Sequence, residues 1–362
     1  MHDRVRIFIS AFFYYGGLVK LIRRWIQGSG QRLTIVNYHQ ASGGDLRSHL
    51  LYLRRHYRIL PLETALEELY MPRRKGVGGK DRRPLQATTF DDGYHDNYTH
   101  AFPPACALQI PITIFLIPGY IGNGNSFWWT SRLIRLARVN RVMLEGRTYR
   151  LDRQEERKAL AQNIDDRFSH ATSSTEREKF LVSLYEFLAM PSPVVLKGEP
   201  APLLTWTQVR EMQESGWVSF GAHTVHHPDL GDLVDPAEVQ RAVGECRTTL
   251  EQQLRHPVRV FAYPFGRIGE NGLCAVKQAG YDWALTIIPG VNTPRSDPHL
   301  LRRRSMDVNK HWLVVAAETA GIWEFFFHLR SDAKLLMRKC LHSLRVILKR
   351  GIHGKLAAGE SL

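Results

Sequence analysis

The chain has 362 residues, 44% of them hydrophobic and 10% aromatic, a balance that excludes disorder throughout its length. Its formal charge of +14 is compatible with an anionic lipid or glycan partner. The sequence contains no zinc finger, RNA-binding signature or basic zipper, so we expect no nucleic-acid partner. Its four cysteines lie far apart and fit neither a disulfide framework nor a thiolate zinc site; they are Cys106, Cys246, Cys274 and Cys340.

The N-terminus contains an apolar run, Ile7 to Val19, that is followed by Lys20, Arg23 and Arg24. The run is too short to span a bilayer comfortably, and no small-x-small cleavage site follows it, so we expect no cleaved signal peptide. Two interpretations stay open. The run forms either a surface helix that caps the fold of a cytoplasmic protein, or an interfacial helix at the inner-membrane surface, with aromatic side chains in lipid and basic side chains at headgroups.

Seven short apolar segments predict β-strands, and most of them lead into polar residues. They are Leu33–Tyr38, Leu85–Phe90, Ile110–Ile117, Trp217–Ala222, Val258–Tyr263, Trp283–Ile287 and Leu300–Met306. Helical patterns lie between them, at Asp45–Arg55, Pro61–Leu69, Trp206–Ser215 (with Thr205 as N-cap) and Pro236–Leu254. Strands that are apolar almost throughout and alternate with helices predict a parallel sheet, either open or closed into a barrel.

Two stretches interrupt this alternation. Residues 73–83 are glycine-rich and basic, which favours an exposed loop, and residues 128–202 form an insertion with helical patterns around 153–167 and 176–189. Residues 333–350 predict a basic amphipathic helix that packs on the fold or contacts a membrane surface. The resulting domain assignment is an N-terminal helix at 1–31, a main domain at 32–307 that includes the insertion, and a helical extension at 308–362.

Two pairs of residues at the ends of predicted strands are candidates for metal binding and catalysis. Asp91 and Asp92 are followed by a glycine that allows a sharp turn, and adjacent carboxylates repel one another unless a cation or water compensates. His223 and His227 are spaced i, i+4, which lets two imidazoles converge on one ion, while His226 should point elsewhere. One carboxylate and two imidazoles form an open ligand set for zinc or a similar ion, and the spare carboxylate can act as a general base. Taken alone, the Asp-Asp-Gly string is also common as an ordinary turn, and the spacing of the two histidines also occurs by chance.

A third string, Phe-Ala-Tyr-Pro-Phe-Gly at 261–266, follows the fifth predicted strand. Its Pro-x-Gly turn can expose backbone N–H groups that stabilise an oxyanion. The alternative is a packed strand that simply ends in a turn.

In this order the motifs resemble those of the polysaccharide deacetylases with a NodB-homology domain, carbohydrate esterase family four. The strings are Thr-Phe-Asp-Asp-Gly at 89–93, His-Thr-x-x-His at 223–227, Phe-Ala-Tyr-Pro-x-Gly at 261–266 and Tyr-Asp-Trp at 281–283, and the resemblance spans residues 34–306. Asn-Tyr-His at 37–39 and Leu-Thr-Trp at 204–206 are similar to the exopolysaccharide-deacetylase branch.

The resemblance implies a distorted (β/α) barrel with about seven parallel strands and an active site at the strand carboxyl ends. It implies hydrolysis of N-acetyl groups on an N-acetylhexosamine-containing glycan. Asp91 would be the general base, and Asp92, His223 and His227 would bind a divalent metal, zinc in the first place, with cobalt or nickel as alternatives. The residues it implies near the substrate are Tyr263, Pro264, Phe265, whose N–H would help to hold the oxyanion, and Trp283, which would line the acetyl pocket.

The sequence departs from the family pattern in two places. Many members have an arginine in the third motif that pairs with the base, and Ala262 stands there. Many also have a late Leu-x-x-His that supplies the general acid, and the matching stretch here, Leu301–Arg304, has no histidine. His39, at the end of the first strand, is our preferred replacement acid. Two alternatives stay open: a non-catalytic glycan- or membrane-associated protein on a degenerate barrel, and a sugar O-deacetylase or deformylase.

Overall fold

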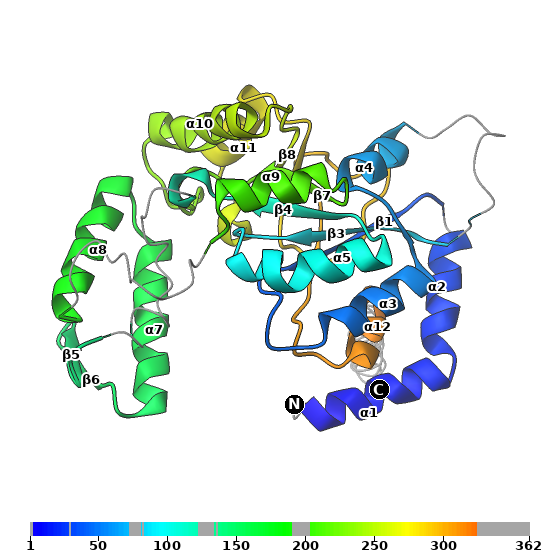
Figure 1. Ribbon diagram of the computed structural model, residues 1–362, viewed down its shortest axis with the longest axis horizontal. Helices are drawn as coiled ribbons and strands as arrows, with labels where there is room; N and C mark the ends of the chain where they lie inside the picture. Colours follow the sequence, from blue (N-terminus) through cyan, green and yellow to red (C-terminus); the bar gives the residue numbers. More distant parts are fainter. Residues whose placement is uncertain are drawn as a thin grey trace, which may run out of the picture.

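The structure is a computed structural model, and it describes residues 3–28, 30–71, 81, 83–121, 134, 137–189 and 203–323. Its centre is a sheet of parallel strands in the order β10-β1-β3-β4-β7-β8-β9, with the short β2 (Arg58–Ile59) beside the start of β3 (Figure 1). The strands are β1 (Leu33–Tyr38), β3 (Leu85–Phe90), β4 (Ile112–Leu116), β7 (Val218–Ala222), β8 (Val260–Ala262), β9 (Trp283–Leu285) and β10 (Arg304–Ser305).

The two ends of the sheet meet in the segment that contains β10. Leu301 bridges to Leu285 of β9, and Arg304 pairs with Val36 of β1. Helices surround the strands, so the predicted distorted (β/α) barrel with about seven parallel strands is confirmed. They are α3 (Leu46–His56), α4 (Leu62–Tyr70), α5 (Phe102–Leu108), α9 (Trp206–Glu214), α10 (Pro236–Leu254) and α11 (Glu270–Gln278).

The sequence analysis did not predict α5 and α11. Both are short, and α5 contains two prolines, at 103 and 104, which read as a break in a sequence. In the structure these prolines follow a π-helical turn, Asn97–Ala101, which leads into α5. The predicted N-cap of α9 is present: Thr205 and Gln208 form a capping box.

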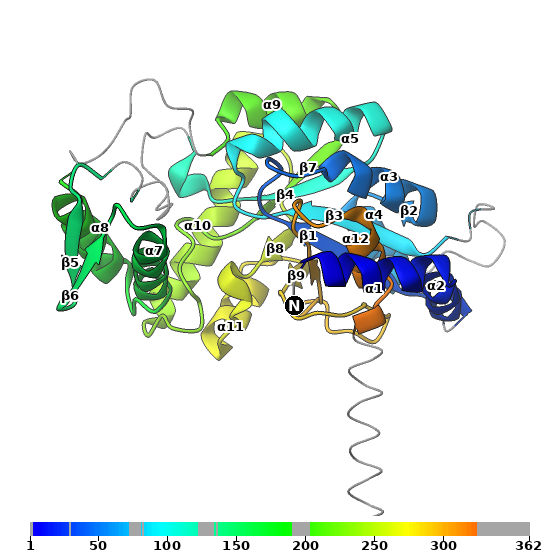
Figure 2. The same cartoon turned by 90° about the horizontal axis from the view of Figure 1, so that it is seen from below.

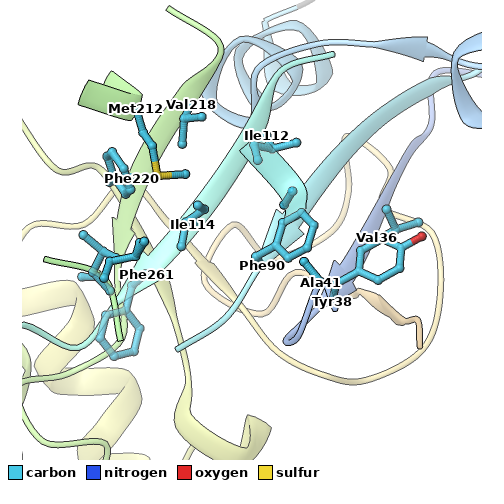
Figure 3. Packing of buried hydrophobic residues seen from close by; sticks show 14 of the residues in the cluster. Val36, Tyr38, Ala41, Phe90, Ile112, Ile114, Met212, Val218, Phe220 and Phe261 are labelled. Carbon is cyan, nitrogen blue, oxygen red and sulfur yellow. The ribbon is translucent and has the colours of Figure 1, made fainter. Parts of the chain in front are cut away.

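Side chains of the strands alternate between the barrel interior and the helices. On the outer face, aromatic and aliphatic side chains such as Tyr38, Phe90, Ile114 and Phe261 belong to one large cluster, in which Met212 of α9 lies beside Phe220 (Figure 3). The inner face belongs to a separate apolar cluster, which the leucines of α4 join: Leu33, Ile35, Leu85, Ala87, Phe115, Val260, Ala262, Leu285, Leu301, Leu62, Leu66 and Leu69. Helix α4 therefore covers the amino end of the barrel and leaves the carboxyl end for function.

The interior changes from apolar to polar towards the carboxyl ends of the strands. Along β3, the inward positions are Leu85, Ala87 and Thr89, followed by Asp91, and all four are buried. Buried polar groups require partners, so the upper interior has to form a network of hydrogen bonds and ion pairs.

The insertion forms a small unit with its own core. It contains a β5–β6 hairpin (Arg141–Leu144 and Arg147–Arg150), which was not predicted, and the helices α7 (Gln154–Ser169) and α8 (Ser174–Phe187), which were. Its core also includes Ile117, which directly follows β4. The unit is therefore attached beside the carboxyl end of the barrel.

The N-terminal apolar run is not one helix. It divides into α1 (Asp3–Tyr15) and α2 (Leu18–Gly28) at Gly16 and Gly17, and Gly17 has a φ of 82° that favours glycine. Both helices pack near α12 (Trp312–Thr319) (Figure 2). The predicted helix at 333–350, Cys340 and most of the predicted loop at 73–83 lie outside the described residues.

Candidate active site and metal centre

Three side chains converge where β3 and β7 end. Asp92 follows β3 by two residues, His223 follows β7 directly, and His227 lies four residues further along. Asp92 has a φ of 70° and His227 a φ of 56°, conformations that non-glycine residues rarely adopt and that cost about 1–3 kcal/mol each. Thr224 and Phe265 share this feature, so four of the eight non-glycine residues with positive φ in the described ranges lie at this site.

The donor atoms of the three side chains are spaced as ligands of one ion. Oδ1 of Asp92 lies 3.5 Å from Nε2 of His223 and 3.5 Å from Nε2 of His227, and the two nitrogens are 3.2 Å apart. Ligands at about 2.0–2.1 Å from a tetrahedral zinc ion lie about 3.3–3.4 Å from one another. All three residues are buried, and Oδ1 of Asp92 has no hydrogen-bond partner among the described residues. The residues therefore fit a divalent cation.

The pKa values of Asp92 and His227, and the hydrogen bond of His223, suit the binding of a metal. Nδ1 of His223 donates to the carbonyl oxygen of Ala262 at 2.7 Å, which leaves the lone pair of Nε2 directed at the site. Burial lowers the pKa of His227 to about 3, so this imidazole is neutral. Burial opposes ionisation of Asp92, but its interactions with the two histidines outweigh burial and hold its pKa well below the usual range.

Asp91 points into the barrel and forms a buried ion pair with Arg303. Nη1 and Nη2 of Arg303 donate to the two carboxylate oxygens at 2.7 and 2.9 Å, and Nδ2 of Asn37 donates to Oδ2 at 3.0 Å. Burial alone would raise the pKa of Asp91, but the guanidinium of Arg303 lowers it below its usual value. Asp91 is therefore an ionised carboxylate in one orientation.

Arg303 compensates for the arginine that is missing from the third motif. Ala262 has no side chain to pair with the base, but an arginine reaches the same carboxylate from the last strand segment. Nε of Arg303 also donates to the carbonyl oxygen of Thr286 at 2.8 Å, and the side chain is fully buried. Sequence reasoning missed Arg303. The available signal was that it stands two residues after Leu301, on the same face of a predicted strand.

Sequence reasoning also missed two polar residues of the site. Oδ1 of Asn37 accepts hydrogen bonds from Nη1 of Arg303 at 3.1 Å and from Oγ1 of Thr89 at 3.2 Å, which joins β1, β3 and the last strand segment into one network. Burial, followed by the charge of Asp92 and a hydrogen bond to it, raises the pKa of Tyr94 far above normal, so this hydroxyl is protonated beside the metal-binding group. Tyr94 follows the Asp-Asp-Gly string directly, which was the signal for it.

His39 is the exposed neighbour of Asp91. Its Nε2 is 4.0 Å from Oδ2 of Asp91, and half of its side chain is exposed to solvent. An exposed imidazole beside a buried carboxylate can exchange protons with solvent and reach a bound substrate. Its role as the acid stays a prediction.

The third motif contacts the site through one side chain and turns another away. Phe265 has a φ of 54°, and its ring lies against His227 at a centroid distance of 4.6 Å, while the role of its N–H as oxyanion donor stays a prediction. Pro264 begins the short 3-10 turn. The ring of Tyr263 belongs to the outer core, and its hydroxyl group donates to the carbonyl oxygen of His299 at 3.2 Å. Tyr263 therefore packs in the outer core under the turn, and its side chain does not point towards the metal-binding group.

Trp283 was predicted to line the acetyl pocket, but its described contacts do not support that position. Trp283 is the first residue of β9, pairs with Val260 and packs in the inner cluster with the leucines of α4. The guanidinium of Arg259 lies 4.6 Å from its ring centroid and binds Glu67 of α4 at 2.6 Å. Trp283 therefore packs against α4 and Arg259 and not against the metal-binding group in the contacts that the structure describes.

Comparison with known proteins identifies relatives of this chain. The family model for polysaccharide deacetylases matches residues 78–284, which is more than half of the chain. YxkH of Bacillus subtilis (strain 168), a protein named as a polysaccharide deacetylase, is 28% identical over 285 residues, covering 75% of this chain and 70% of YxkH.

Two solved structures share the fold. The Streptococcus pyogenes deacetylase PplD, in complex with acetate, is 18% identical with a TM-score of 0.51, and the match covers 80% of this chain and 99% of that one. IcaB from Ammonifex degensii is 20% identical with a TM-score of 0.51, over 80% and 98% of the two chains. At this level of identity the two structures support the barrel fold alone.

Proposed function

Because this chain belongs to the polysaccharide deacetylase family, and is therefore a hydrolase of carbon–nitrogen bonds other than peptide bonds, we propose that it removes N-acetyl groups from N-acetylhexosamine units of a glycan. An exopolysaccharide or another polymer of the cell envelope is the proposed substrate. The observation that carries the proposal is the convergence of three buried metal-ligand atoms, 3.2–3.5 Å apart, beside an ionised carboxylate.

Asp92, His223 and His227 would hold the divalent cation, with zinc as the first choice and cobalt or nickel as alternatives. When bound, such an ion lowers the pKa of a water molecule and polarises the acetyl carbonyl. Tyr94 supports this group, since its hydroxyl hydrogen bonds to Asp92 and keeps the carboxylate in place.

Asp91 would act as the general base. The bidentate pair with Arg303 keeps its carboxylate ionised and oriented, so that it can take the proton of the attacking water. Water adds to the acetyl carbon, the C–N bond breaks, and the nitrogen receives a proton, which yields acetate and a free amine. His39, exposed and 4.0 Å from Asp91, would supply that proton, and the N–H group of Phe265 would stabilise the oxyanion.

Ile287 takes the place that the sequence analysis assigned to Trp283. It is two-fifths exposed and packs on Gly266, next to Phe265, whose ring covers His227. An apolar ring on His227 and a neighbouring aliphatic side chain suit the methyl group of an acetyl substituent. We expect Ile287→Ala to raise KM for an acetylated substrate more than it lowers kcat.

The test of the function is acetate release from chito-oligosaccharides or an acetylated exopolysaccharide by zinc-loaded protein. Asp91→Asn should retain zinc but lose at least about two orders of magnitude in rate. His223→Ala should lose the zinc itself, measured by elemental analysis. His226→Ala is the matched control, because this exposed neighbour contacts Tyr120 and not the metal-binding group, and it should retain both properties.

The alternatives correspond to other outcomes of the same experiment. Equal acetate release by wild type and Asp91→Asn would contradict the mechanism. Release from O-acetyl esters but not from N-acetyl amides would indicate an O-deacetylase. Glycan binding without release from any substrate would indicate a non-catalytic protein, an alternative that the presence of Arg303 beside Asp91 makes less attractive.

A further inference from the structure

The first two helices of the chain each pack one side on the protein. Val19 and Ile22 of α2 are buried with Ala317, Ala320 and Ile322 near α12, and Ser10 of α1 is fully buried. Arg6 of α1 binds Glu318 of α12 at 2.6 Å. Both helices are therefore part of the folded protein, along the outer side of the barrel (Figures 1 and 2).

The opposite side of these helices is apolar and faces solvent. Its large side chains, which we call the N-terminal apolar surface, are between 46% and 75% exposed: Val5, Phe8, Phe12, Tyr15, Leu21 and Trp25. Along α1 the spacing is three, four and three residues, and along α2 it is four, so each set forms one stripe on its helix. The outward face of a helix on a soluble protein is normally polar, so this surface requires a partner.

Positive charge surrounds this surface. Arg4, Lys20 and Arg24 are exposed on the same two helices. The first 28 residues contain five arginines and lysines and one aspartate, so their net formal charge is 5 − 1 = +4. A second copy of the chain, which carries +14 overall, would be repelled, whereas an anionic bilayer would be attracted.

The side chains also suit the boundary between lipid and water. Tyrosine and tryptophan combine a large apolar ring with a polar group, and lysine and arginine can extend to headgroups while their stems lie in apolar surroundings. Among the described residues, no single helix has the length and apolar composition to cross a bilayer, and residues 4–15 and 18–25 meet that test only as a pair bent by 66°. Since the inner sides of both helices pack on the protein, a position parallel to the membrane plane follows.

We propose that the N-terminal apolar surface binds the surface of an anionic lipid bilayer and holds the enzyme there. Phe8, Phe12 and Tyr15 enter the boundary of the acyl chains, and Lys20 and Arg24 meet anionic headgroups. No residue of this surface belongs to the active site. The proposal is independent of the acetyl chemistry.

The test is flotation of the full-length protein with vesicles of phosphatidylcholine, with and without phosphatidylglycerol. We expect binding that requires phosphatidylglycerol and weakens with salt. The triple variant Phe8→Ser, Phe12→Ser, Tyr15→Ser should bind about tenfold more weakly or worse, and Lys20→Glu, Arg24→Glu should lose the preference for the anionic lipid. The matched control exchanges exposed apolar residues elsewhere, Met71→Ser, Met143→Ser and Val234→Ser, and should bind as wild type does.

Two results would overturn the proposal. One is unchanged vesicle binding by the triple aromatic variant, which would place the contact on another segment of the chain. The other is a wild-type protein that ignores vesicles but forms a dimer, measured by light scattering, that the triple variant abolishes. All variants should release acetate from soluble oligosaccharides at the wild-type rate, so a failure of the proposed function and a failure of membrane binding are distinguishable.

Discussion

The ion pair between Asp91 and Arg303 allows a quantitative test of how the barrel holds its base. Both side chains are almost fully buried, and two charge-assisted hydrogen bonds of 2.7 and 2.9 Å join them. Arg303→Met replaces the arginine by an apolar side chain of similar length and leaves the carboxylate with Asn37 as its remaining described donor. Removing one partner of a buried pair costs about 3–5 kcal/mol, because the other charge stays buried without compensation.

The double variant separates the pair from its surroundings. Asp91→Asn alone should also cost about 3 kcal/mol, since it leaves the arginine charge uncompensated. If the two effects were independent, the double variant would lose about 6–8 kcal/mol; because both groups belong to one pair, we expect at least about 2 kcal/mol less than that sum. The assay is urea unfolding of the metal-free proteins, followed by tryptophan fluorescence.

Arg259→Met is the control for the loss of an arginine as such. Arg259 binds Glu67 and Asp282 at 2.6 Å each, but these groups are partly exposed, so the loss should stay below about 1 kcal/mol. Arg303→Met should also reduce acetate release by about a hundredfold or more with zinc still bound, because a base displaced by about 1 Å loses that much. Additive losses in the double variant, or wild-type activity in Arg303→Met, would refute the reasoning.

Three further predictions follow from single residues. His39→Gln should lower kcat by about 10²–10⁴-fold without loss of zinc, and an unchanged kcat would exclude this histidine as the acid. Gly266→Ala should destabilise the protein by about 2 kcal/mol or more in thermal unfolding, because its Cβ would overlap Ile287 at a φ of 67°; Gly146→Ala, with φ 77° and open space, should cost only about 1 kcal/mol. Burial lowers the pKa of His49 from 6.5, so the folded protein binds fewer protons there and stability should fall as the pH drops below 6.5; His49→Gln should flatten this pH dependence of urea unfolding, and an unchanged slope would exclude His49 as its source.

The sequence was sufficient wherever a local pattern decides the structure. β1 and β3 run over the predicted residues, because six consecutive buried positions followed by polar ones leave little freedom in where a strand ends. The same holds for α10 and for the capping box of α9. The predicted metal ligands also converge, since the carboxyl ends of parallel strands meet at one edge of the sheet.

Errors arose where the result depends on which end or face of an element reaches the site. Trp283 belongs to a motif near the end of the resemblance, yet it starts its strand and packs with the leucines of α4. Tyr263 is adjacent to a functional turn, yet alternation along the strand directs its ring to the outer core. A shift of one residue along a strand moves a side chain to the other face of the sheet. A shift of two or three residues moves it along the barrel axis, towards or away from the site.

By itself, the sequence determined the parallel strands and placed two carboxylates and two imidazoles at strand ends, and its resemblance to the deacetylase family predicted separate roles for Asp92 and Asp91. The strands depend on local apolar patterns and the placement on the direction of the strands. Only the tertiary structure decided which cation holds Asp91, because Arg303 is 212 residues away along the chain and reaches the carboxylate only when the last strand segment lies between β1 and β9. It also decided which apolar side chains of α1 and α2 stay exposed, since packing against the region around α12 selects the buried side of each helix.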